Sequence, residues 1–210
     1  MNICSSAGRK HLLSQSFRTD EFDLPMELDI LEEFVNFVSC KENSKCVDLV
    51  SRRLSQLNDI HQTIQNLKSG QTLDDIELFE IKNFAINSNE IWKSLSLSGL
   101  DILPYHDLQE VICILDPENN GIPSFYVYSV YDEKLARLRK EYDEAKLNGQ
   151  NEKAERLRLE AIEIEDSIRF SLSEKLRKFG EEIGDNYRQL AKLDVFMAKA
   201  VLARDFNFCK

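Results

Sequence analysis

Apolar residues between positions 131 and 203 recur at helical spacing, and no other stretch of the chain is as regular. Within residues 131–147 they follow spacings of three, four and three, at Leu135, Leu138, Tyr142 and Ala145. The same rhythm resumes after residue 151, with charged residues at the positions between. A repeat close to 3.5 residues with charges on the other faces predicts paired helices that share a narrow apolar seam.

A turn separates the two regular runs. The pair Asn148-Gly149 lies between them, and Asn-Gly favours a turn. We therefore expect residues 131–147 to fold back antiparallel on the start of a second arm, residues 152–203. Gly180 and Gly184 interrupt that arm, and each costs roughly 1 kcal/mol relative to alanine inside a helix. The sequence thus predicts a bend near residues 179–183.

The preceding part of the chain predicts shorter amphipathic helices joined by polar segments. The predicted helices are residues 26–39, residues 46–67, a helix that starts after Thr72 and continues through Trp92, and a short helix after Pro104. Thr72 is the predicted N-cap of the third of these helices. Residues 19–25 read as a polar loop. Residues 123–130 alternate and are the one strand-like run.

Together these patterns predict an all-α fold with two parts. Residues 1–130 form a helical core, and residues 131–210 form a long projecting antiparallel hairpin, the lever, that returns to the core. Four apolar residues near its end are spaced by three, four and four: Leu190, Leu193, Met197 and Val201. This face is too apolar for a solvated tail, so we expect it to pack on the core, against residues 46–67 and the Phe79–Phe84 face.

The overall charge argues against nucleic-acid binding by the whole surface. The net charge is −10, and an acidic protein does not attract a phosphate backbone by its overall field. Contact with nucleic acid would need a local basic patch. Lys146 and Lys153 flank the predicted hairpin tip and are the candidate contacts. The remaining basic clusters alternate with acidic residues, as on a salt-bridged helix face.

The sequence shows no constellation that predicts catalysis or metal binding. His11, His61 and His106 are far apart, the five cysteines form no closely spaced pair, and no phosphate-binding loop is present. The aromatic residues between 125 and 131 could stack on bases or pack a loop against helices. We expect no catalytic, cofactor or metal site, and thus no enzyme. Reduced thiols, no long apolar run and no signal peptide predict a cytoplasmic protein without a membrane segment.

Four blocks of the sequence resemble the core and lever region of the MutS family of DNA mismatch-repair ATPases. Each block is short, but their order and spacing match along nearly the whole chain. The blocks are Ser5-Ser6-Ala7-Gly8-Arg9 with Leu12-Leu13; residues 73–84; residues 108–121 followed by Ser129 and Leu135-Ala136-Arg137-Leu138-Arg139; and residues 190–200, with Leu193-Asp194 and the alanines that follow.

The chain also departs from the family's pattern. Nothing corresponds to the mismatch-binding and connector domains, and residues 147–151 stand where the family has its DNA-gripping clamp. The ATPase domain would be expected just after Lys210, so the resemblance implies a piece of a longer protein. It implies ATP and Mg²⁺ as cofactors of that full-length protein, double-stranded DNA as its partner, and a homodimer when the ATPase domain is present.

These inferences lead to two expectations of function. The first is a non-catalytic core and lever module that couples an ATPase domain to the engagement of DNA or a partner, in mismatch repair or recombination. The second, from a different class, is a coiled-coil scaffold for protein interactions that is unrelated to DNA.

Overall fold

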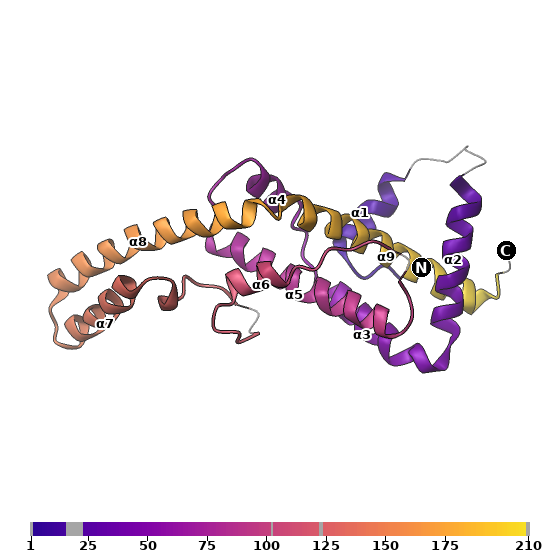
Figure 1. The fold of residues 1–210 in the computed structure, drawn as a ribbon. Coiled ribbons are helices and arrows are strands. Elements are labelled where there is room, and N and C mark those ends of the chain that lie inside the picture. Colours follow the sequence, from indigo (N-terminus) through magenta and orange to yellow (C-terminus); the bar gives the residue numbers. More distant parts are fainter. Residues whose placement is uncertain (1, 16–22, 102, 122–123, 209–210) are drawn as a thin grey trace. The chain divides into compact units, whose positions relative to one another are not determined.

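The computed structural model describes residues 2–15, 23–101, 103–121 and 124–208. Within these ranges the chain forms nine α-helices and two short 3-10 helices, without a β-strand, which confirms the predicted all-α class (Figure 1). The elements are α1 (Ser6–Ser14), α2 (Asp23–Ser39), η1 (Lys41–Asn43), α3 (Ser44–Ser55), α4 (His61–Lys68), α5 (Asp75–Leu97), α6 (Gln109–Leu115), η2 (Ser129–Tyr131), α7 (Glu133–Leu147), α8 (Asn151–Arg177) and α9 (Gly180–Phe206). None of the described helices is both long and apolar enough to span a lipid bilayer.

The chain divides into two compact units, each assembled from separated stretches. Unit 1 comprises Met1–His61, Asn83–Gln109 and Glu181–Lys210, and unit 2 comprises Gln62–Lys82 and Glu110–Gly180. Helix α5 passes through the division without a break, whereas α8 and α9 are separate helices at the division near residue 180. The predicted partition into a core, residues 1–130, and a lever, residues 131–210, does not coincide with these units. It stays a prediction about which parts of the chain act together.

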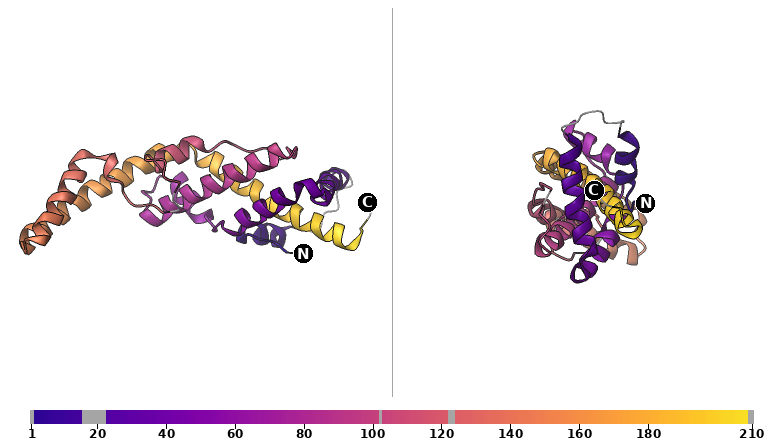
Figure 2. Two further views of the ribbon diagram at one scale, coloured as in Figure 1. Left: turned by 90° about the horizontal axis from the view of Figure 1, so that it is seen from below. Right: turned by 90° about the vertical axis from the view of Figure 1, so that its right-hand side faces the viewer.

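In unit 2, α7 packs along the first part of α8, in the pairing that the apolar spacing predicts (Figures 1 and 2). The buried seam contains Leu138, Ala145, Ala154 and Leu157, with Tyr142 and Ile164 packed beside it. Helix α7 begins at the N-cap Asp132, whose carboxylate accepts hydrogen bonds from two backbone amides. It ends in a turn that Gly149 makes possible with a φ of 70°.

The second arm is interrupted close to the predicted bend. Helix α8 ends at Arg177 and α9 begins at Gly180, so Lys178 and Phe179 form a turn between them. The Phe179 amide donates to the Leu176 carbonyl at 2.9 Å, a short-range bond that closes the last turn of α8. Where the sequence predicted one bent helical arm, the chain therefore forms two successive helices.

The predicted helix over residues 46–67 is wrong, because the chain forms two helices there. Helix α3 ends at Ser55 and α4 begins at His61. Between them the Asp59 carboxylate accepts a hydrogen bond from the His61 amide at 3.3 Å. Asn58 and Asp59 favour such local bonds over the helical ladder, which explains the break within an otherwise continuous apolar pattern.

Two predicted boundaries also need correction. The N-cap of α5 is Asp74 rather than Thr72: its carboxylate accepts from the Glu77 amide at 2.8 Å, and Glu77 accepts from the Asp74 amide at 3.0 Å. This reciprocal pair is a capping box. Helix α2 starts at Asp23, inside the predicted loop, because a proline such as Pro25 is tolerated in a first helical turn.

The strand-like run does not form a strand. Of residues 123–130, Pro123 lies outside the described residues, 124–128 are irregular, and η2 follows. Tyr128 is buried, with ring centroids of Phe125, Tyr126 and Tyr131 at 5.8, 4.4 and 5.9 Å. A lone segment without a pairing strand has no ladder to join, so its aromatic residues pack together instead.

In unit 1, α9 supplies much of the buried core. Leu190, Leu193 and Met197 are buried, whereas Val201 is only partly covered. Phe196 stacks on Phe34 of α2 with ring centroids 5.4 Å apart. The predicted burial of this face is thus met for three of its four residues, and α2 is a neighbour that the sequence did not identify.

Candidate functional site

The predicted nucleic-acid contacts lie on either side of one turn. Lys146 is in the last turn of α7 and Lys153 is in the first turn of α8, and both side chains are exposed. The Lys146 ammonium lies 5.4 Å from the centroid of the Tyr142 ring. Leu147, at the same tip, is 87% exposed. The tip therefore presents two cations next to an exposed leucine.

Several other basic residues of the hairpin are engaged in ion pairs. Lys134 pairs with Glu160 at 2.6 Å across the two helices, and Arg158 pairs with Glu155 at 3.2 Å within α8. These contacts agree with the predicted salt-bridged face.

The buried carboxylate of Asp194 joins α9 to the start of α1. It accepts hydrogen bonds from the Cys4 amide at 3.0 Å, the Ser5 amide at 2.7 Å and the Ser5 hydroxyl at 2.6 Å. The Ser5 oxygen in turn accepts from the Gly8 amide at 2.9 Å and caps α1. Asp194 is 1% exposed. Hydrogen bonds to a carboxylate in such a dry place are stronger than bonds between neutral groups.

This junction has no room for a side chain at residue 8. A Cβ added to Gly8 would overlap the Asp194 carboxylate and would meet Ile3 at 2.8 Å. Burial, helped by the Asp194 charge, raises the pKa of the neighbouring Cys4 thiol. That thiol is therefore held protonated, which suits a structural role and not a nucleophile.

Two further polar contacts fix α9 inside unit 1. Asn186 accepts from the His106 amide at 2.8 Å and donates to the His106 carbonyl at 2.7 Å, so one side-chain amide clamps one residue of the loop before α6. The Tyr187 hydroxyl donates to Asp59 at 2.6 Å, and Lys10 also contacts that carboxylate. Burial raises the Asp59 pKa, but these hydrogen bonds outweigh it and lower the pKa below its ordinary value.

Unit 2 contains a fully buried cation. The Lys82 ammonium lies 3.2 Å from Asp116 Oδ1, and these two side chains are 0% and 1% exposed. It donates to the Tyr128 hydroxyl at 3.1 Å and to the Ser124 carbonyl at 3.2 Å. The second Asp116 oxygen accepts from the Gly121 amide at 2.8 Å. At Oδ1 the Lys82 contact is an ion pair without the alignment of a hydrogen bond.

The ion pair sets the protonation of this cluster. Burial raises the pKa of Asp116, but the Gly121 amide and the Lys82 ammonium outweigh it and hold the pKa below 3.8. Burial also raises the pKa of Tyr131, whose hydroxyl donates to the Ile114 carbonyl at 2.8 Å. At neutral pH the Asp116 carboxylate is thus ionised, and the Tyr131 hydroxyl is protonated. The groups of this cluster contact one another across the core of unit 2, which is typical of structural clusters.

Each of two histidines lies near a residue of α9. The His61 ring lies 6.4 Å from that of Tyr187, and His106 lies 3.5 Å from Asp185. Among the described residues, no three histidine, cysteine or acidic side chains gather in a way that could hold a metal ion.

Sequence reasoning missed two buried charged groups, a carboxylate and an ammonium. Asp194 lies in the otherwise apolar run of residues 190–200, and Lys82 lies among the apolar residues of its helix. A charge on an apolar face is the signal that could have found them, because a buried charge needs a partner. The identities of those partners, Ser5 and Asp116, required the fold.

Two comparisons of the sequence with known proteins find no match. No model of a known protein family matches the sequence. No curated protein matches it either.

Proposed function

We propose that this chain is a non-catalytic core and lever module of a MutS-like DNA-repair or recombination protein. In this role it transmits changes between an ATPase domain and the engagement of DNA or a partner protein. ATP and Mg²⁺ act in that ATPase domain. No residue of this chain is assigned to chemistry.

The contact between Ser5 and Asp194 carries the proposal. These two residues belong to the first and fourth of the family-like blocks and are 189 positions apart. The buried Asp194 carboxylate accepts bonds from Ser5 at the start of α1, which gives both residues a structural role. An unrelated coiled-coil hairpin would have no need for such a junction.

The arrangement of the second arm also supports a mechanical role. Helix α8 is 27 residues long and is followed, after a two-residue turn, by a further 27-residue helix. A rigid helix can transmit a displacement, provided that the chain has alternative arrangements to adopt. The turn at Lys178 and Phe179 is where we place that freedom.

A protein-interaction scaffold is the second candidate function. It is favoured by the apolar residues that the hairpin exposes, since Leu147 is 87% and Leu159 53% exposed. Such residues could anchor a partner helix without any involvement of DNA or ATP.

Nucleotide binding by the complete product of the gene separates the two candidates. We expect its sequence to contain a Walker-type Gly-Lys-Ser or Gly-Lys-Thr loop, and its titration with a fluorescent ATP analogue and Mg²⁺ to saturate. A complete product without such a loop, and without nucleotide binding, would favour the scaffold.

A further inference from the structure

The connection between α4 and α5 lies against the last turns of α8, inside unit 2 (Figure 1). Residues 71–74 of this connection have no regular secondary structure. On α8 the contacts come from Arg169, Ser173 and Arg177. These three residues are four positions apart and therefore share one helix face. A further contact comes from Gly180, directly after the turn at residues 178–179.

The central contact is a buried hydrogen bond. The Leu73 amide donates to the Ser173 hydroxyl at 2.9 Å, and that hydroxyl donates to the Arg169 carbonyl at 2.8 Å. Leu73 is 0% and Ser173 2% exposed. Because Leu73 lies outside a helix, no helical ladder pairs its amide, and the Ser173 hydroxyl takes that place.

A two-pronged ion pair holds the end of the connection that enters α5. Arg169 Nε lies 2.8 Å from Asp75 Oδ1, and Arg169 Nη2 lies 3.2 Å from Asp75 Oδ2. Two parallel bonds between a guanidinium and a carboxylate fix their mutual orientation as well as their distance. The first residue of α5 is thus tied to α8 one helical turn before Ser173.

At the end that leaves α4, two glycines allow a close approach. Gly70 has a φ of 82°, and a Cβ added to it would overlap the Arg177 guanidinium. A Cβ added to Gly180 would lie 3.1 Å from the Lys68 Cγ. The connection therefore touches the chain on both sides of the turn at residues 178–179.

We infer that residues 68–75 form a strap that holds this turn in place, and that release of the strap frees the turn. Phe179 is 8% exposed, and its amide closes the last turn of α8 on the Leu176 carbonyl at 2.9 Å. Since residues 71–74 are not helical, the strap can leave α8 without the unfolding of α4 or α5. As a device of the lever, the strap rests on the proposed function.

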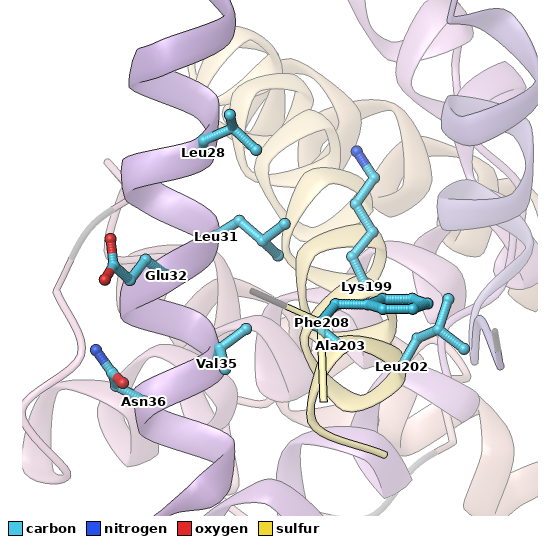
Figure 3. Close-up of a pocket in the computed structure, with 9 residues that line it drawn as sticks. All are labelled: Leu28, Leu31, Glu32, Val35, Asn36, Lys199, Leu202, Ala203 and Phe208. Atoms are coloured by element: carbon cyan, nitrogen blue, oxygen red, sulfur yellow. The ribbon is translucent and has the colours of Figure 1, made fainter. Parts of the chain in front are cut away.

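Hydrogen exchange followed by mass spectrometry tests the strap on this chain without nucleotide. Ser173→Ala leaves the buried Leu73 amide unpaired, so exchange in peptides covering residues 66–75 and 174–181 should accelerate on the order of tenfold. The hairpin tip and the end of α9 should be unchanged. At the end of α9, Leu202 and Ala203 line an apolar groove beside α2 in unit 1, away from the strap's contacts (Figure 3).

A serine on the same helix supplies the matched control. Ser167 is exposed, and its hydroxyl donates to the Ile164 carbonyl at 2.7 Å and makes no bond to the strap. Ser167→Ala should leave the exchange of all four peptides unchanged. If Ser173→Ala accelerated residues 66–75 alone, the strap would not hold the turn. Equal acceleration of all four peptides would mean a general loss of stability, and either result would overturn the inference.

A milder pair of variants decides the question should Ser173→Ala not fold. Asp75→Asn weakens the ion pair at one end of the strap and should accelerate the same two peptides about threefold. Asp166 pairs with the same Arg169 at 2.7 Å but lies on α8 itself, so Asp166→Asn should have no such effect. An unchanged residue 174–181 peptide in Asp75→Asn would contradict the strap. Because nucleotide is absent, a failed strap leaves the coupling to an ATPase domain untouched, and a failed coupling leaves these exchange rates as expected.

Discussion

Gly8 lies against the Asp194 carboxylate so closely that a methyl group on residue 8 would overlap it. This contact connects α1 with α9, two helices at opposite ends of the chain. Gly8 leaves room for the Asp194 carboxylate, and that carboxylate accepts the hydrogen bonds of Cys4 and Ser5. The junction fixes the start of the chain on the helix that closes unit 1.

Gly8→Ala should therefore destabilise unit 1, although glycine to alanine inside a helix ordinarily stabilises by up to roughly 1 kcal/mol. The added methyl group would displace the carboxylate from the Ser5 and Cys4 amides. Each buried donor left unpaired costs about 1–3 kcal/mol. Urea unfolding followed by the fluorescence of Trp92, the chain's only tryptophan and a residue of unit 1, measures the effect. Equal or greater stability in Gly8→Ala would contradict the described junction.

The Lys82–Asp116 pair should make unit 2 sensitive to acid. The pKa of Asp116 is lowered below 3.8 in the folded chain, so its stabilising effect is present above that value and is lost as the pH falls through the folded pKa. Asp116→Asn should therefore destabilise at pH 7, and its difference from wild type should shrink below about pH 4. Urea titrations at several pH values, followed by circular dichroism, measure this. Glu118→Gln, in the same loop but exposed, should show neither effect.

Removal of the cation should be more damaging than removal of both charges. Lys82→Met leaves a buried carboxylate without its counter-ion, which costs roughly 3–5 kcal/mol, whereas replacing a buried pair by apolar residues is often nearly neutral. A double substitution, Lys82→Met with Asp116→Leu, should therefore regain part of the loss. If the double variant were as unstable as the sum of the single ones, the two charges would not be coupled.

The apolar face of α9 in unit 1 should matter more for stability than the seam between α7 and α8. Leu193 is 1% exposed in the core of unit 1, and Leu138 is 7% exposed in the narrow α7–α8 seam. Truncation in a close-packed core costs roughly 2–5 kcal/mol, so Leu193→Ala should lower the melting temperature by several degrees. Leu138→Ala should lower it much less. Differential scanning calorimetry measures both melting temperatures. A larger decrease in Leu138→Ala than in Leu193→Ala would contradict the prediction that α9 anchors the second arm.

The helical pairing could be predicted from the sequence, but the junctions could not. The spacing of Leu138 and Leu157 depends only on local periodicity, so it identified the α7–α8 seam. The break near Asp59 was missed because a continuous apolar pattern hides a polar pair that bonds locally. The partner of Asp194 lies 189 positions away, and no periodic pattern encodes such a distance.

Duplex DNA binding by this chain alone should be weak. Its net charge is −10, and Lys146 and Lys153 are the candidate contacts that the sequence indicates. We expect a Kd no tighter than the ordinary non-specific range of about 10⁻⁴–10⁻⁶ M at about 0.15 M salt. Reversal of both charges should abolish any residual binding in an electrophoretic mobility shift. A salt-sensitive, sub-micromolar Kd would contradict this expectation.

The central claim is that the second arm responds to nucleotide. Spin labels at Lys153, at the start of α8, and at Arg188, on the exposed surface of α9, would report the distance across the turn at Lys178 and Phe179. Pulsed electron resonance on the complete gene product, in a cysteine-free background, gives that distance distribution with and without a non-hydrolysable ATP analogue and Mg²⁺. The proposed lever predicts that the distribution shifts when nucleotide binds. An identical distribution at saturating nucleotide would contradict the claim and leave the scaffold as the better account.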